Sequence, residues 1–173
     1  MSSSKISRAP VWVLTGGMAL AIGLVLLGAR LAAQPAPVPD LSRPGTAAEP
    51  RQVSVIMRDY AFNPTPLYLV GGETVEFYII NGGLVAHEFV LGDSEVQRAW
   101  AVASGATPAA PFATPPPASV PPAIGGVRVL LASGADARVR YEVPPAGAQL
   151  QLMCHLPGHL ARGMVGEVIL TSR

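Results

Sequence analysis

The sequence predicts an all-β domain, a β-sandwich or barrel, preceded by one apolar N-terminal helix. From residue 51 onward, short segments alternate apolar with polar residues, and Gly and Pro separate these segments at close intervals. This spacing is typical of sandwiches and barrels. A third observation, an uncharged apolar run at residues 11–29, predicts the helix. The chain has 173 residues, so there is room for one domain of ordinary size after the N-terminal segments.

The N-terminal segment, residues 1–33, is predicted to be a membrane anchor or a signal segment. Its apolar run is 19 residues long. A membrane-spanning helix needs about 20 such residues, whereas the apolar region of a cleaved signal usually has about 7–15. An uncleaved transmembrane helix is therefore the favoured interpretation. Lys5 and Arg8 precede the run, which places the domain on the extracytoplasmic side of the cytoplasmic membrane. Cleavage after residues 31–33 is the alternative and would give a secreted or periplasmic protein.

Residues 34–50 are predicted to form a linker, and the domain to occupy residues 51–173. The linker contains five prolines and no apolar periodicity, which is typical of an extended tether. Within the domain, the alternation predicts strands at residues 52–58, 67–70, 74–80, 85–91, 127–132, 137–143, 149–154 and 165–171. In the first of these strands, Val53, Val55 and Met57 share one face, which we expect to be buried.

An insertion at about residues 92–126 interrupts this pattern. Asp93 and Ser94 can cap one helical turn through Trp100. The following residues, 99–126, have no charge and seven prolines. No packed core can be predicted from such a segment, so we expect a loose surface insertion that contributes nothing to a site.

The chemistry of the chain is concentrated in residues 154–164, which read CHLPGHLARGM. They contain the only cysteine of the protein, two of its three histidines and one methionine. Two His and one Cys in a trigonal plane, with a weak axial Met, form a copper redox site. Cys154, His159 and Met164 match three of these ligands, and His87 is the histidine left to supply the fourth. His155 follows the cysteine directly, so in an extended strand it points away from the metal.

Three of these four side chains have a structural alternative when each is considered alone. His87 lies on an apolar strand face with Phe89, where a histidine is more often part of the core. Cys154 can be a small buried hydrophobic residue, and Met164 can fill a gap in the core. The coincidence of all four residue types at this spacing favours copper.

The spacing Cys-x4-His-x4-Met, with Pro-Gly before the His, resembles the C-terminal copper loop of the cupredoxins, the type 1 blue copper proteins such as plastocyanin, azurin and auracyanin. Residues 81–91 resemble the strand of that family that carries the distant histidine. The resemblance implies a bacterial exported cupredoxin with a Greek-key β-sandwich and one copper ion bound by His87, Cys154, His159 and Met164. Many blue copper proteins have Asn directly after the first histidine, where this chain has Glu88. A carboxylate there either faces solvent or modulates the site.

The expected function is to carry single electrons between extracytoplasmic redox proteins, which would dock at the apolar loop around His159. Four protein ligands leave no open position for a substrate, so we expect no enzymatic activity. A module for copper delivery or sensing in the periplasm is the alternative, because the same ligands bind Cu(I).

The net charge of +1 provides no basic surface for nucleic acid, and a single Cys cannot form an internal disulfide. We expect a monomer held to the membrane by its N-terminal helix.

Overall fold

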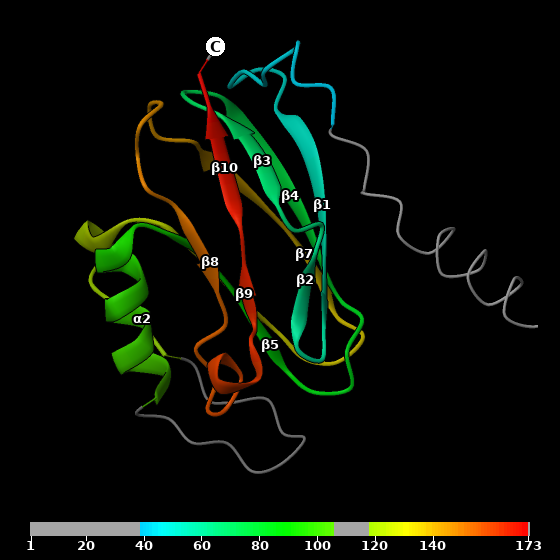
Figure 1. Ribbon diagram of the computed structural model, residues 1–173, viewed down its shortest axis with the longest axis vertical. Helices are drawn as coiled ribbons and strands as arrows, with labels where there is room; N and C mark the ends of the chain where they lie inside the picture. Colours follow the sequence, from blue (N-terminus) through cyan, green and yellow to red (C-terminus); the bar gives the residue numbers. More distant parts are fainter. Residues whose placement is uncertain (1–38, 106–117, 173) are drawn as a thin grey trace, which may run out of the picture. The chain divides into compact units, whose positions relative to one another are not determined.

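The structure, a computed structural model, describes residues 39–105 and 118–172, which form a β-sandwich with one α-helix against it (Figure 1). The strands are β1 (Arg51–Arg58), β2 (Ala61–Asn63), β3 (Leu67–Val70), β4 (Thr74–Asn81), β5 (His87–Gly92), β6 (Val127–Leu131), β7 (Asp136–Glu142), β8 (Gln151–Met153), β9 (Val165–Gly166) and β10 (Val168–Thr171). The helices are α2 (Ser94–Gly105) and two short 3-10 turns, η1 (Pro122–Ile124) and η2 (Leu160–Arg162). The prediction of a mainly β domain is confirmed.

The strands form two four-stranded sheets and one additional pair. The first sheet has the order β2-β1-β4-β7, with β1 and β4 parallel and the other neighbours antiparallel. The second sheet has the order β6-β5-β8-β9 and is antiparallel throughout. The parallel pair β3 and β10 follows on from β9, because only Glu167 separates β9 from β10. The predicted single strand at 165–171 is thus divided where the chain changes its pairing partner from β8 to β3.

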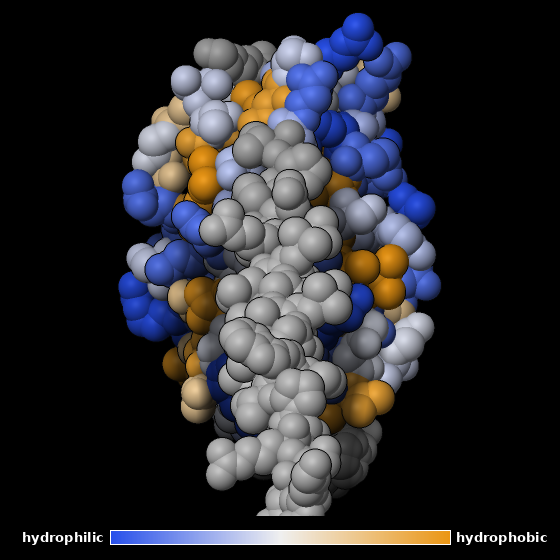
Figure 2. Space-filling model, turned by 45° about the vertical axis from the view of Figure 1, so that its right-hand side comes forward, coloured by the Kyte–Doolittle hydropathy of each residue, from blue (hydrophilic) through white to orange (hydrophobic). Residues whose placement is uncertain are grey.

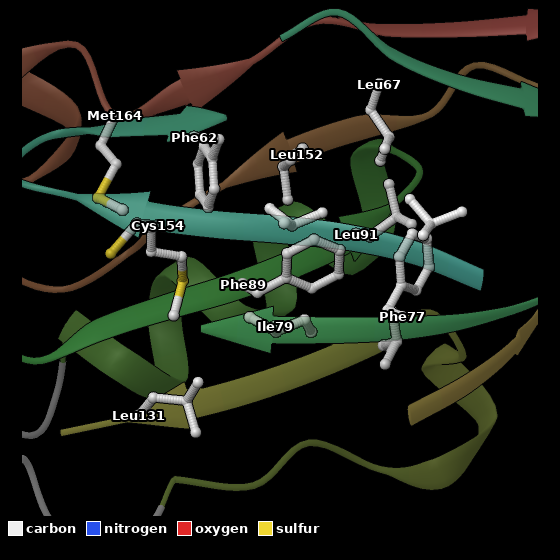
Figure 3. Close-up of a cluster of buried hydrophobic side chains, with 14 of the residues drawn as sticks. Phe62, Leu67, Phe77, Ile79, Phe89, Leu91, Leu131, Leu152, Cys154 and Met164 are labelled. Atoms are coloured by element: carbon white, nitrogen blue, oxygen red, sulfur yellow. The ribbon is translucent and has the colours of Figure 1, made fainter. Parts of the chain in front are cut away.

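One apolar core lies between the sheets, and the predicted alternation is confirmed at its centre. Val53, Val55 and Met57 of β1 are 8%, 0% and 0% exposed. Figure 3 shows the middle of this core, where Phe77 and Ile79 of β4 meet side chains of β5 and β8. On the face of the molecule shown in Figure 2, apolar residues lie in small groups between hydrophilic ones, which is ordinary for a protein surface.

Strand β5 is buried on both faces, because the main core covers one face and α2 covers the other. Phe89 and Leu91 belong to the main core. Val90, which points the other way, packs against Val96 and Trp100 of the helix. All six residues of β5 are buried. This strand carries His87, so its double cover keeps the histidine away from solvent.

The prediction of a loose insertion after β5 is wrong for the residues that the structure describes there. Helix α2 spans 12 residues, not one turn. Asp93 caps it, since its Oδ1 accepts hydrogen bonds from the N–H groups of Glu95 and Val96 at 2.9 and 3.0 Å. Trp100 is 9% exposed, and Ala118, Val120 and Ile124 also pack against this small cluster. The sequence alone does not indicate this packing, because the helix buries its apolar side chains against the outer face of β5, which is formed by a separate segment.

The end of the predicted linker lies against the domain in the described residues. Gly45 is buried, and its N–H donates to Oε2 of Glu73 at 3.2 Å while its carbonyl accepts from Thr74 N–H at 3.0 Å. The guanidinium of Arg51 pairs with the same carboxylate. The predicted anchor at residues 1–33 lies outside the described residues. Among the residues that are described, no helix has the length and apolar character needed to cross a bilayer.

We predict that Trp100→Ala lowers the free energy of unfolding by about 3–5 kcal/mol, because it removes the largest side chain that fixes α2 on β5. Val102→Ala on the same helix is the control, since Val102 is 71% exposed. It is expected to change the free energy of unfolding by less than about 0.5 kcal/mol. Equal effects of the two variants in urea titrations would show that the helix does not pack on the strand.

Candidate metal centre

His87 is the first residue of β5, and the loop before it is fixed by a buried asparagine. The Nδ2 group of Asn81 donates to the carbonyl oxygens of Val85 and Leu131 at 2.8 and 3.0 Å. Its Oδ1 accepts from Gly83 N–H at 2.9 Å. Both ends of the loop at residues 82–86 are thus tied to one side chain, so the position of His87 is set before any metal binds.

Cys154 follows β8 and is brought to β5 by the pairing of the two strands. Val90 lies opposite Met153 in this antiparallel register, so Cys154, the residue directly after β8, points into the core. Cys154 is fully buried, and its Sγ accepts a hydrogen bond from Glu88 N–H at 3.3 Å. Burial outweighs this hydrogen bond and raises the pKa of the Cys154 thiol to about 12. In the metal-free protein the thiol therefore keeps its proton at neutral pH.

The loop after Cys154 folds back on itself and returns Met164 to the cysteine. The carbonyl of His159 accepts from Met164 N–H at 3.1 Å, and Cys154 N–H donates to the carbonyl of Met164 at 3.3 Å. Gly163 has a φ of 86°, a left-handed conformation in which glycine is favoured. Met164 is fully buried, and Figure 3 shows its side chain at the same end of the core as Cys154.

Three side chains converge with the separations that a metal ion requires. Nδ1 of His159 lies 3.2 Å from Sγ of Cys154 and 3.2 Å from Nδ1 of His87. These three atoms all lie within 4.8 Å of one another. Nitrogen and sulfur donors bound at roughly 2.0–2.3 Å to one ion lie roughly 3–4 Å apart, so the two separations of 3.2 Å fit a metal such as copper.

The His159 imidazole is in the form that offers a nitrogen lone pair. Burial, followed by the nearby His87, lowers the pKa of His159 to about 4. The His159 ring is therefore neutral at neutral pH, which is the form that binds metals. The structure thus brings His87, Cys154 and His159 together, and it places Met164 beside them as a candidate axial donor.

His155 points away from this cluster, as expected from the alternation of a strand. Its Nε2 lies 2.8 Å from Oε1 of Gln97 on α2. Gln97 in turn donates from Nε2 to the carbonyl oxygens of Gln151 and Val90 at 2.7 and 3.1 Å. The residue next to the cysteine is therefore part of the contact between β8 and the helix.

Glu88 is fully buried, which excludes the solvent-facing alternative. Its Oε1 accepts hydrogen bonds from Nε of Arg128 and Oγ of Ser104, both at 2.9 Å. The guanidinium of Arg128 also stacks on the ring of Trp100, 4.7 Å from its centroid. Glu88 thus donates its N–H to Sγ of Cys154, while its carboxylate accepts from Arg128 and from Ser104 on α2.

Sequence reasoning missed two residues that contact the histidines, Asp59 and Tyr60, at the turn between β1 and β2. Oδ1 of Asp59 lies 2.7 Å from Nε2 of His87. The Tyr60 ring makes edge contacts with both imidazoles, with its centroid 4.8 Å from that of His159 and 5.9 Å from that of His87. The guanidinium of Arg162 stacks on the Tyr60 ring, 4.6 Å from its centroid. The only sequence signal for these two residues was the predicted strand at 52–58, which they directly follow. Their place beside the histidines comes from the parallel pairing of β1 with β4, in which Met57 lies opposite Asn81.

Comparisons with known proteins agree with this site. No protein-family model matches the chain. The copper-resistant cuproprotein CopI of Rubrivivax gelatinosus is 38% identical over 130 residues, which cover 74% of this chain and 72% of the relative. Among solved structures, auracyanin B aligns with a TM-score of 0.55 at 27% identity, over 74% of this chain and 97% of its own. Auracyanin A of Chloroflexus aurantiacus, described as a "blue" copper protein, aligns with a TM-score of 0.54 at 22% identity, over 70% and 99% of the two chains, and supports the fold alone.

We predict that the Cys154 thiol releases one proton when copper binds. Its pKa is about 12 in the metal-free protein, and a metal-bound sulfur is a thiolate, so the proton leaves at every pH below that value. His159 releases none above about pH 4, because its ring is already neutral. The affinity should therefore rise about tenfold per pH unit between about pH 6 and pH 8. Anaerobic Cu(I) calorimetry in buffers of different ionisation enthalpy measures the proton count.

Cys154→Ser is the control for this measurement, because a serine hydroxyl keeps its proton and should abolish the release. Release of no proton by the unaltered chain would contradict the assignment of Cys154 as the buried ligand.

Proposed function

The chain belongs to the CopI family of cuproproteins and has the cupredoxin fold, and we propose that it is a type 1 copper protein that carries single electrons between redox proteins. The observation that carries this proposal is the convergence of one thiol and two imidazoles, from segments far apart in the sequence, at one buried point. Thiolate and imidazole suit both oxidation states of copper.

In this proposal His87, Cys154 and His159 would hold copper, and the thioether of Met164 would be a fourth, weaker donor. Bound copper supplies the one-electron change between Cu(II) and Cu(I). The protein contributes donors that are already in place: the Asn81 hydrogen bonds fix the loop before His87, and the Met164 backbone closes the loop after Cys154. Donors that are held by the fold move little when the charge of the metal changes, which favours rapid electron transfer.

The same ligand set argues against catalysis at the metal. A catalytic metal keeps a coordination position open for substrate or water. Here the residues that carry the three donor atoms are buried, and in this proposal the thioether of Met164 fills the fourth position. We therefore propose a carrier rather than an enzyme.

Redox partners are proposed to dock at the end of the sandwich where the ligand loops meet. Leu84, in the loop before His87, is 80% exposed, and Leu160, directly after His159, is 40% exposed. Exposed apolar side chains beside a buried redox centre allow a partner to exclude water and approach closely. We propose that electrons pass through the His159 ring, and that the protein acts as a monomer.

The proposed location is the extracytoplasmic side of the bacterial membrane. The basis is the sequence of residues 1–33, with Lys5 and Arg8 before an uncharged run of spanning length. In this proposal the run either anchors the domain or is cleaved as a signal, and the domain functions outside the cytoplasm in both cases.

A second candidate function is copper binding for resistance, delivery or sensing. The name of the Rubrivivax relative, a copper-resistant cuproprotein, favours this candidate. The two functions differ in what leaves the protein. A carrier gives up an electron and keeps its metal, whereas a delivery protein gives up the ion.

The proposed function is tested by loading the purified full chain with Cu(II) and recording its visible absorption. We expect an intense charge-transfer band from the Cys154 thiolate, which is lost on reduction and returns on oxidation with copper still bound. His87→Ala should weaken copper binding and change the band. His155→Ala is the matched control and should leave the band in place, because His155 contacts Gln97 and not the cluster. Equal losses in the two variants would contradict the ligand assignment.

Substitutions of Met164 are expected to change the reduction potential in a defined order. Gln offers a harder amide oxygen that stabilises Cu(II), so the potential of Met164→Gln should lie below that of the unaltered chain. Met164→Leu removes the donor and leaves an apolar site that disfavours the more highly charged Cu(II), so its potential should lie above. Voltammetry of the three copper-loaded proteins measures this series, and three equal potentials would show that Met164 is not the axial ligand.

A further inference from the structure

His87 makes one contact that the ligand cluster does not explain, a hydrogen bond from its second ring nitrogen. While Nδ1 faces the other donors, Nε2 lies 2.7 Å from Oδ1 of Asp59. The imidazole is fully buried and the carboxylate side chain is 26% exposed. Asp59 belongs to the turn between β1 and β2, so a separate element of the fold contacts His87 on the side of its ring that faces away from the other donors.

The loop before His87 is shaped around this carboxylate. Oδ2 of Asp59 accepts from Leu84 N–H at 2.9 Å, and Val85 N–H also points at the carboxylate. A Cβ on Gly83 would lie 2.4 Å from Oδ1 of Asp59 and 2.7 Å from Nε2 of His87. The contact between the acid and the imidazole therefore depends on the absence of a side chain at position 83.

The hydrogen bonds of Asp59 determine which ring nitrogen of His87 carries the proton. Oδ2 of Asp59 accepts from Leu84 N–H at 2.9 Å, and Oδ1 lies 2.7 Å from Nε2 of His87. A carboxylate whose two oxygens both act as acceptors has no proton to donate. Its partner Nε2 must then be the donor, which leaves the lone pair of His87 on Nδ1, toward Cys154 and His159.

We propose that Asp59 is the positioning residue of His87, fixing its ring orientation and its Nε2–H tautomer so that Nδ1 is ready to bind copper. This inference rests on the proposed role of His87 as a ligand. A carboxylate behind a ligating imidazole also makes the other ring nitrogen more basic and strengthens its bond to the metal. Loss of such a partner typically lowers metal affinity on the order of 10–100-fold.

The decisive variant is Asp59→Asn, which keeps the shape of the side chain but changes its hydrogen bonding. The two backbone N–H groups of Leu84 and Val85 need an acceptor, so the amide oxygen should turn toward them. The amide NH₂ then faces Nε2 of His87, which favours the tautomer with the proton on Nδ1. A side chain that only supported the turn would be replaced by Asn without consequence, whereas a residue that fixes the tautomer would not.

Two measurements on the full chain test this. In the metal-free protein at neutral pH, long-range ¹H–¹⁵N spectra of the histidine rings should show His87 protonated on Nε2, and on Nδ1 in Asp59→Asn. Copper affinity, measured by competition with a chelator, should fall on the order of 10–100-fold in the variant. Asp136→Asn is the matched control, because it removes the same charge from an exposed position on β7 and should change neither quantity.

A second pair of variants tests the same hydrogen bond by changing the loop before His87. Gly83→Ala should separate Asp59 from His87 and lower copper affinity. Gly82→Ala is its control, since a Cβ there would meet Cγ2 of Ile56 at 3.3 Å and nothing of the cluster. If Gly83→Ala does not fold, the Asn variant still decides the question.

The outcomes separate this inference from the proposed function. A charge-transfer band in the unaltered chain, together with an unchanged tautomer and affinity in Asp59→Asn, would overturn the role of Asp59 and leave the electron carrier intact. Absence of the band, together with the predicted changes in tautomer and affinity, would overturn the electron carrier and support Asp59 as the positioning residue of a copper-binding histidine.

Discussion

The candidate copper site depends on the antiparallel register of β5 against β8. In this register Val90 lies opposite Met153, so Cys154 points into the core and accepts a hydrogen bond from Glu88 N–H. A slip of one residue would turn Cys154 outward and bring Met153 inward, because side chains alternate between the two faces of a strand. The register is specified by apolar packing: Phe89, Leu91 and Leu152 are fully buried in the core. Hydrophobic side chains thus determine where the metal-binding atoms meet.

Strand β5 also links the ligand cluster to helix α2, because its consecutive side chains point to opposite faces of the sheet. His87 faces the cluster, and Glu88 carries a buried carboxylate toward the helix side, where Arg128 and Ser104 bind it. Removing a carboxylate from water is costly unless it is paired and hydrogen-bonded. Both conditions are met at Oε1 of Glu88, whereas its buried Oε2 has no hydrogen-bond partner among the described residues. The helix therefore has two structural roles at the site. It partners the residues that follow His87 and Cys154 in the sequence, and it covers the outer face of the strand.

The sequence was most informative where its signals were local. The spacing of residues 154–164 identified three of the candidate ligands, and period-two alternation placed the buried face of β1. It was least informative where burial depends on distant partners. The length of α2 depends on the outer face of β5, the burial of Glu88 depends on an arginine 40 residues later, and the contact of Asp59 with His87 depends on how β1 pairs with β4. No local pattern records such pairings.

We propose that one thiolate and two imidazoles, held by the fold, keep the same metal in both of its oxidation states. X-ray absorption spectroscopy at the copper edge, on the oxidised and reduced forms of the full chain, tests this most directly. The account predicts one short copper–sulfur bond and two imidazole nitrogens in both forms, with little change in bond length. A reduced form that loses an imidazole or gains additional sulfur ligands would contradict it, because such a site releases or exchanges its ion and does not conserve its geometry for electron transfer.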